Sequence, residues 1–246
     1  MIPGAFVVAG GSSGIGAEIA SAITSVGRRV GVVTHRKGAP PNLPPTTRTE
    51  LVDWVRADLR STLETSSAVL AWADGIGGAV DGLVLSAVSY GRGGRHSLQE
   101  TDLTEWDEII GVNLRSQFIL ISTVLPLLLA RPRALIIAVS SSAAIEPAPG
   151  RAAYAASKAG SLALMRALAE ELAGTSVSVV QVMPRNQVVT PGLSARRPAG
   201  FSFDGYDSPA IFRPFILDAL ASMGSGRRGE LITVESDGHW HPATES

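Results

Sequence analysis

The chain has 246 residues, 45% of them hydrophobic, and a formal net charge of −1, so it can bury a sizeable core and shows no basic block typical of a nucleic-acid surface. It has no cysteine, which excludes disulfides and thiolate metal sites, and its histidines do not cluster with carboxylates, so we expect no metal site. The longest apolar-rich run, 118–130, is too short and too broken to span a bilayer, and no basic region precedes an apolar one at the start. We therefore expect a cytoplasmic protein without a membrane or nucleic-acid partner.

The first predicted strand, Ala5 to Ala9, is an apolar run without polar alternation, as in a parallel sheet that is buried on both faces. A glycine-rich turn follows at once, and a helix pattern then runs from 17 to 26. Such a turn lets a backbone approach a pyrophosphate, and the helix N-terminus supplies free N–H groups. The spacing Gly-x-x-x-Gly-x-Gly favours dinucleotide binding over its alternative, a tight turn with spare glycines. The contacts we expect from it are Gly10, Ser12, Ser13, Gly14, Ile15 and Gly16.

The second predicted strand, Val30 to Thr34, ends without the Asp or Glu that usually holds a free ribose 2′-hydroxyl. Thr34 stands at that position, and His35, Arg36 and Lys37 follow it. These cations favour a 2′-phosphate, so the sequence predicts NADP(H) with His35 and Arg36 as donors. The alternative interpretation is an ordinary solvated basic loop.

The rest of the chain alternates between strand and helix patterns. Four prolines between 38 and 49 predict an extended loop where a crossover helix would otherwise lie. Strands are predicted at 51–55, 81–85, 135–139, 177–182 and 230–234, and helices at 61–76, from about 104 to 130 with a bend at Pro126, at 154–173 and at 210–223. His239 and His241 are expected on a surface tail. The alternation predicts a single-domain α/β fold over 1–246, a Rossmann-type doubly wound parallel sheet of about seven strands with helices on both faces, and 190–213 as a substrate loop or lid.

Tyr154 and Lys158 are four residues apart, so on a helix they share a face. An ammonium beside a phenol favours the phenolate, which predicts a pKa for Tyr154 below its ordinary value of about 10. A hydroxyl from Ser141 can hold a carbonyl oxygen while the phenol exchanges a proton. Most Tyr-x-x-x-Lys pairs are surface helix pairs, so the prediction of catalysis depends on the rest of the chain.

Taken together, these motifs resemble the short-chain dehydrogenase/reductase family in its compact form, over nearly the whole chain. The resemblance rests on the glycine-rich turn, Asp58, Asn113, Ser141 and the Tyr154–Lys158 pair, in that order. It implies that Tyr154 is the general acid or base and that Lys158 lowers its pKa and holds the nicotinamide ribose. It also implies that Ser141 orients the substrate carbonyl and that Asn113 holds a water of the proton relay.

The same resemblance implies further cofactor contacts and an assembly. Besides Tyr154 and Lys158, the implied cofactor contacts are Asp58, Leu59, Ala87, Pro184 and Thr190. The family often forms dimers and tetramers through its long helices, so we expect a homo-oligomer.

The chain departs from the family pattern at two places near the cofactor. Leu85, Ser86, Ala87 and Val88 stand where the family usually has Asn-Asn-Ala-Gly, and Arg185 stands where it has Gly. Arg185 is placed to hold an acidic or phenolate group. Neither change removes a catalytic group.

The sequence therefore predicts an NADPH-dependent ketoreductase with Tyr154 as general acid. Candidate substrates are acyl-carrier or polyketide-like ketones, cyclic ketones and quinones. Two alternatives stay open: an NAD(P)-dependent dehydrogenase of a small alcohol or sugar, and a non-catalytic dinucleotide-binding sensor. The complete Asn, Ser, Tyr and Lys set argues against the sensor, whereas Leu85 and Arg185 keep it open.

Overall fold

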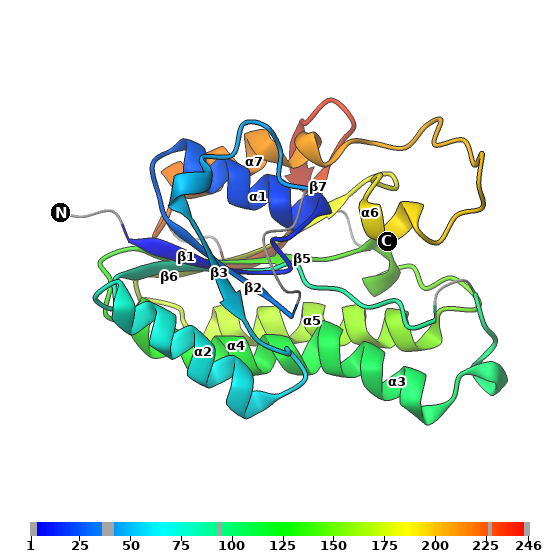
Figure 1. Ribbon diagram of the computed structural model, residues 1–246, viewed down its shortest axis with the longest axis horizontal. Coiled ribbons are helices and arrows are strands. Elements are labelled where there is room, and N and C mark those ends of the chain that lie inside the picture. Colours follow the sequence, from blue (N-terminus) through cyan, green and yellow to red (C-terminus); the bar gives the residue numbers. More distant parts are fainter. Residues whose placement is uncertain (1–3, 36–41, 93–94, 226–227, 244–246) are drawn as a thin grey trace.

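The computed structural model describes residues 4–35, 42–92, 95–225 and 228–243. Within these residues one sheet has the strand order β3-β2-β1-β4-β5-β6-β7-β8, with β1 to β7 parallel and β8 antiparallel to β7 (Figure 1). The strands are β1 Ala5–Ala9, β2 Val30–Thr34, β3 Val52–Arg56, β4 Val80–Leu85, β5 Ala134–Val139, β6 Val177–Pro184, β7 Arg228–Val234 and β8 Trp240–Pro242. The predicted doubly wound parallel sheet is confirmed.

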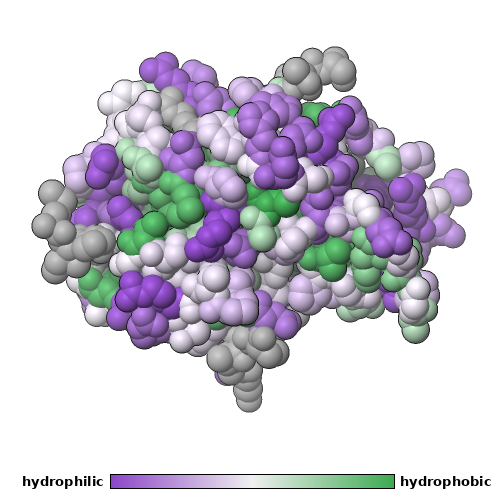
Figure 2. Space-filling view, turned by 90° about the horizontal axis from the view of Figure 1, so that it is seen from above, coloured by the Kyte–Doolittle hydropathy of each residue, from purple (hydrophilic) through white to green (hydrophobic). Residues whose placement is uncertain are grey.

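Helices cover both faces of this sheet (Figure 1). They are α1 Gly14–Ser25, α2 Thr62–Gly75, α3 Leu103–Ile110, α4 Ser116–Leu129, α5 Ala152–Glu171, α6 Pro191–Ser194 and α7 Arg213–Ala221. One layer contains α1 and α7, and the other contains α2, α4 and α5. The outer surface above α1 and α7 mixes hydrophilic and hydrophobic residues, and its apolar patches are small and separate among the described residues (Figure 2).

The strands are apolar without alternation because successive residues face opposite helical layers. In β1, Phe6 and Val8 pack in the layer of α1 and α7, whereas Val7 and Ala9 pack in the layer of α2, α4 and α5. The sheet therefore buries both of its faces, and polar side chains that serve chemistry gather where the strands end.

Between β2 and β3 the described residues, 35 and 42–51, contain one 3-10 turn, Thr49–Leu51, and no α-helix. This agrees with the extended loop that the prolines predict, because proline removes the amide donor that a helix interior needs. The crossover leaves the outer side of β3 lightly covered, and Val52, Asp53 and Trp54 are only half-buried.

The long helix predicted at 104–130 is divided in the structure. A π-helical segment, Gly111–Arg115, separates α3 from α4, whereas α4 continues through Pro126 as helix. By length and composition, Leu103–Leu129 is apolar enough to cross a membrane. In this fold it packs against α2, α5 and β4, so much of its apolar surface belongs to the core.

The C-terminal histidines do not lie on a tail, contrary to the prediction. Trp240–Pro242 form β8, which pairs antiparallel with β7 and places the Trp240 ring edge-to-face on Phe215, with 5.5 Å between ring centroids. His241 Nε2 lies 2.9 Å from a carboxylate oxygen of Glu235, which raises the pKa of the imidazole. A three-residue strand gives a weak sequence signal because its pairing with β7 decides its conformation.

We predict that Gly82→Ala destabilises the protein, because Gly82 of β4 lies directly beside the Phe6 ring of β1. A Cβ at position 82 would come within 2.0 Å of a ring carbon of Phe6, which is fully buried. Forcing the ring aside should lower the free energy of unfolding by about 1–3 kcal/mol, measured by urea denaturation. Gly75→Ala is the matched control, since nothing lies within 4 Å of its added Cβ. Equal stabilities for the two variants would contradict the prediction.

Candidate active site

A cavity of about 930 Å³ extends along the carboxyl ends of the parallel strands. Its walls include Gly10 after β1, Thr34 at the end of β2, Ser86 after β4, Ser140 after β5 and Pro184 at the end of β6. Ligands of open α/β sheets bind at this edge, near the point where the strand order reverses. Here β1 lies between β2 and β4, so the reversal falls at the glycine-rich turn.

Most of the residues predicted from the sequence line this one cavity. They are Gly10, Ser12, Ser13, Gly14, Ile15, Gly16, His35, Asp58, Leu59, Ala87, Ser141, Tyr154, Lys158, Pro184 and Thr190. Arg185 lines it as well. Asn113 lies outside its walls and is fully buried, and Arg36 lies outside the described residues.

The glycine-rich turn fits a dinucleotide. Gly10 has φ +79°, and an added Cβ would meet the backbone nitrogen of Ala87 at 2.5 Å. A Cβ on Gly16 would lie 2.3 Å from the carbonyl oxygen of Gly10, so the turn closes tightly on the start of α1. Ser13, which precedes α1, makes no capping side-chain hydrogen bond. The first N–H groups of α1 are thus available to a pyrophosphate in the cavity.

At the ends of β2 and β3 the cavity wall includes His35, Arg60 and the carboxylate of Asp58. Arg60, which sequence reasoning missed, lines the cavity and pairs with Asp58 at 2.7 Å. The side-chain hydrogen bond from Arg60 is the main cause that lowers the pKa of Asp58 to about 2. His35 lies at the exposed rim, and Thr34 beside it is buried. Asp58 therefore stays ionised at neutral pH, with its charge partly balanced by Arg60.

Tyr154 and Lys158 are brought from α5 to the end of β5. Lys158 Nζ donates a hydrogen bond to the carbonyl oxygen of Val139 at 2.9 Å and lies 5.9 Å from the centroid of the Tyr154 ring. Ser141 lies two residues after the end of β5, and its hydroxyl accepts a hydrogen bond from the Ala143 amide at 3.3 Å. The Ser141 hydroxyl also interacts with the phenol of Tyr154. The structure therefore places Ser141, Tyr154 and Lys158 around one end of the cavity.

The pKa of Tyr154 moves in the direction opposite to the sequence-based expectation. Burial raises it, the neighbouring Tyr90 raises it further, and the hydrogen bond with Ser141 and the charge of Arg151 oppose the rise. The expected lowering by Lys158 fails because the ammonium is directed at Val139 and the phenol is largely removed from water. At neutral pH the phenol thus keeps its proton, which is the state a proton donor needs.

Lys158 is itself 4% exposed, and burial lowers its pKa from 10.5 to about 8. Its hydrogen bond to Val139 satisfies one of its three donors. The remaining donors are available on a side chain that lines the cavity.

Asn113, in the π-helical segment, is engaged by the protein. Its Oδ1 accepts from the Ser89 amide at 2.7 Å, and its Nδ2 donates to the Ser89 carbonyl at 2.9 Å and to Ser157 Oγ at 3.1 Å. Ser157 Oγ in turn donates to the carbonyl oxygen of Tyr154 at 2.7 Å. The amide side chain therefore ties the loop after β4 to α5 and helps to hold Tyr154 in place.

Tyr90 and Arg196 are site residues that sequence reasoning missed. The Tyr90 ring stacks on Tyr154 with 4.9 Å between centroids and an 18° interplanar angle. The Arg196 guanidinium lies 3.7 Å from the Tyr90 centroid. It lies on the face of Tyr90 away from Tyr154, because the space between the two stacked rings is too narrow for a guanidinium. The signals were an aromatic residue in the loop after β4 and an arginine in the loop at 190–213.

Comparisons with known proteins agree with this arrangement. A family model described as short chain dehydrogenase matches residues 5–198. The 2-(R)-hydroxypropyl-CoM dehydrogenase of Xanthobacter autotrophicus is 31% identical over 191 residues, which cover 75% of this chain and 74% of that protein. The 2-(S)-hydroxypropyl-CoM dehydrogenase 3 of the same organism is 26% identical over 242 residues, 93% of each chain.

Solved structures show the same fold. A variant of actinorhodin polyketide ketoreductase, determined with NADPH, superimposes with a TM-score of 0.77 at 25% identity over 96% of each chain. The chain therefore belongs to the short-chain dehydrogenase/reductase family. It is an oxidoreductase that uses a nicotinamide dinucleotide and acts on CH–OH or C=O groups.

We predict that Lys158→Met stabilises the cofactor-free protein at pH 7. A lysine whose pKa falls from 10.5 unfolded to about 8 folded is charged in both states at pH 7, so its buried charge opposes folding there. Stability gained from deprotonation then appears as pH rises from about 8 to 10.5. After allowance for the lost hydrogen bond to Val139, the variant should be more stable by about 1–2 kcal/mol at pH 7.

Urea denaturation at pH 7 and pH 10 measures this difference. The advantage of Lys158→Met should shrink at pH 10, because the wild-type side chain is then largely neutral in the folded protein. A variant that is less stable than the wild type at pH 7 would contradict the predicted sign.

Proposed function

We propose that this enzyme is a ketoreductase that uses NADP(H) as its hydride carrier and Tyr154 as its general acid. The observation that carries the proposal is the buried phenol of Tyr154, which keeps its proton and lies beside Ser141 and Lys158 in the dinucleotide cavity. A bound nicotinamide supplies the hydride to the carbonyl carbon. Tyr154 supplies the proton to the carbonyl oxygen, which gives an alcohol.

The other groups support this proton transfer. The hydroxyl of Ser141 is a donor that can hold the carbonyl oxygen beside the phenol. Lys158 Nζ lies 5.9 Å from the centroid of the Tyr154 ring, and the donors that Val139 leaves free can bind the ribose of a nicotinamide. Asn113 acts as a positioning residue through Ser157 and the backbone of Tyr154.

The preference for NADP(H) is supported by charge at the ribose end of the cavity. Thr34 stands where a carboxylate would repel a 2′-phosphate, and the wall beside it carries His35 and Arg60, with Arg60 paired to Asp58. A charged hydrogen bond contributes roughly 1.5–3 kcal/mol, which corresponds to about a ten- to hundredfold preference. The similarity of the fold to that of the polyketide ketoreductase determined with NADPH also supports this preference.

For the substrate we propose a ketone within the range suggested by the sequence, namely an acyl-carrier or polyketide-like, cyclic or quinone carbonyl compound. The named relatives, two hydroxypropyl-CoM dehydrogenases and a polyketide ketoreductase, support chemistry at a secondary alcohol or ketone. The loop at 190–213 forms one wall through Leu193 and Arg196 and therefore contributes to selectivity.

We also propose a homo-oligomer, because Phe118 on α4 exposes 61% of its surface.

Tyr154→Phe should abolish turnover while NADPH affinity stays within a few fold. Loss of general acid catalysis typically lowers kcat by about 10²–10⁴, and phenylalanine keeps the volume of the ring. The assay follows NADPH oxidation with a panel of ketones and quinones, and circular dichroism checks the fold of the variant. A variant that reduces the same ketone at the wild-type rate would remove Tyr154 from the mechanism.

The wild type should show kcat/KM about ten- to hundredfold higher with NADPH than with NADH. Thr34→Asp should reverse part of this preference, because it places an anion against the phosphate and an acceptor beside a free ribose hydroxyl. Thr34→Asn is the matched neutral control and should keep the preference for NADPH. Equal kcat/KM values for the two cofactors in the wild type would refute the NADP(H) assignment.

A further inference from the structure

A second, smaller cavity of about 270 Å³ adjoins the dinucleotide cavity. The two share seven lining residues, Tyr90, Arg95, Arg151, Tyr154, Gln187, Leu193 and Arg196. The small cavity therefore lies beside the reacting end of the site. At roughly 30 Å³ per water-sized group, it has room for about nine non-hydrogen groups. This suits a short ketone or the end of a longer one.

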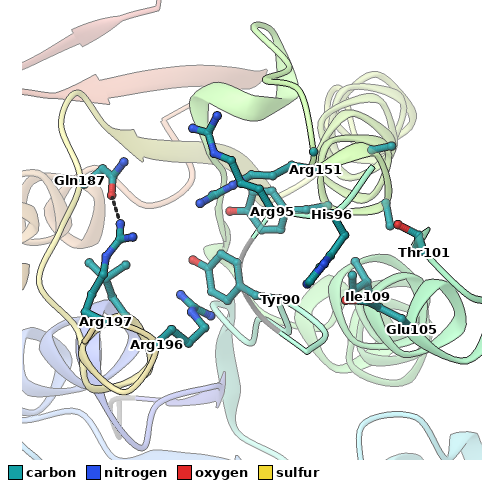
Figure 3. A pocket seen from close by; sticks show the side chains of 15 residues that line it. Tyr90, Arg95, His96, Thr101, Glu105, Ile109, Arg151, Gln187, Arg196 and Arg197 are labelled. Atoms are coloured by element: carbon teal, nitrogen blue, oxygen red, sulfur yellow. Dashed lines mark hydrogen bonds between the residues drawn. The ribbon is translucent and has the colours of Figure 1, made fainter. Parts of the chain in front are cut away.

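The walls of the small cavity carry a concentration of positive charge. Arg95 comes from the loop after β4, Arg151 is the residue before α5, and Arg196 and Arg197 follow α6. Figure 3 shows Arg95, Arg151 and Arg196 gathered about the Tyr90 ring, with Arg197 on the opposite wall and joined to Gln187. Three separate segments thus direct guanidinium groups to one small space.

Among the described residues, no carboxylate forms an ion pair with these guanidinium groups. Glu105 lines the cavity, but its carboxylate is paired with Arg92 at 2.9 Å, and that guanidinium lowers the pKa of Glu105. In the part of the chain that the structure describes, none of the four arginines lies within ion-pairing distance of a carboxylate. Like charges in one partly buried space repel each other, so an anion placed among them is stabilised.

Two of these arginines also have a buried donor atom without a hydrogen-bond partner. The Nε atoms of Arg151 and Arg197 are buried without a partner in the structure. A buried donor without an acceptor costs free energy, and an oxyanion supplies several acceptors at once. Arg197 is otherwise anchored, since Nη2 lies 3.2 Å from the Tyr206 hydroxyl and its guanidinium lies over the Phe201 ring. Arg151 and Arg196 are the better placed to bind a ligand.

The column of Arg196, Tyr90 and Tyr154 connects these cations to the phenol. Arg196 rests on the face of Tyr90 away from Tyr154, and Tyr90 stacks on Tyr154, so the guanidinium lies one ring beyond the phenol in the same stack. Arg151 precedes Tyr154 by three residues, and its charge acts directly on the phenol. Arg151 and Arg196 therefore line the same small cavity as the proton donor.

We propose that Arg151 and Arg196, with Arg95 and Arg197 behind them, form a subsite for an oxyanion on the substrate, so that the enzyme reduces ketones that carry a carboxylate or a phosphate. The proposal rests on the ketoreductase function above and narrows its substrate class. In this arrangement the guanidinium groups bind the oxyanion, Ser141 holds the carbonyl oxygen and Tyr154 donates the proton.

The test uses pairs of ketones that differ in charge, acetoacetate with its methyl ester, and dihydroxyacetone phosphate with dihydroxyacetone. With NADPH, wild-type kcat/KM should favour the anionic member of at least one pair, and the responding pair distinguishes carboxylate from phosphate. Arg151→Gln and Arg196→Gln should each lower the ratio of kcat/KM for that anion to kcat/KM for its neutral partner by about 10- to 100-fold. Arg196→Lys keeps the charge and should retain part of the preference.

Arg133→Gln is the control for loss of an arginine. Arg133 is exposed just before β5, at the amino end of that strand and so away from the cavity. Its replacement should leave kcat/KM for all four ketones unchanged. Equal wild-type kcat/KM within both pairs, or equal losses for anion and neutral ketone in the glutamine variants, would overturn the subsite and leave the ketoreductase function standing.

A different outcome separates the two proposals. If NADPH reduces none of the four ketones, the ketoreductase assignment fails for these substrates, and the subsite is judged by calorimetric titration of acetoacetate and dihydroxyacetone phosphate in the presence of NADPH. Binding to the wild type that is lost in both glutamine variants supports the subsite. Absence of binding to the wild type, or binding that the variants retain, overturns it.

Discussion

Burial of Tyr154 and Lys158 at the end of β5 is the constraint on which the site depends. Both side chains are less than a tenth exposed. Burial therefore removes the stabilisation that water would give to their charged forms. The structure compensates with the hydrogen bond from Lys158 to Val139 and with the interaction between Ser141 and the phenol. The end of β5 therefore fixes the position of the Lys158 ammonium. The same contacts hold the fold together and position the reactive groups.

Burial of the strands explains why the sheet could be predicted from the sequence. Both faces of β1 and β2 are covered, so each reads as an uninterrupted apolar run, and the predicted bounds agree with the structure. The glycine-rich turn was also predictable, because contacts within it and with Ala87 demand glycine at Gly10. These features depend on neighbouring residues or on a simple periodicity.

What the sequence did not show depends on segments far apart in the chain. The direction of the Tyr154 pKa is set by removal from water and by Tyr90, which lies 64 positions earlier in the sequence. Arg151 and Arg196 form a cluster only because α5 and the segment after α6 meet beside the loop after β4. The side-chain bonds of Asn113 require the π-helical segment, for which its residues gave no signal. Tertiary placement decides each of these properties.

The short strand β8 has a consequence for the solubility of the molecule. A parallel sheet leaves its outermost strands with unpaired N–H and C=O groups, to which a strand of another molecule can add. Among the described residues, β8 pairs three residues with β7 on this side, and the last of them, Pro242, has no N–H to donate. An approaching strand therefore meets a short and interrupted template. The C-terminal segment protects this edge of the sheet against strand addition and aggregation while it leaves the helical faces open.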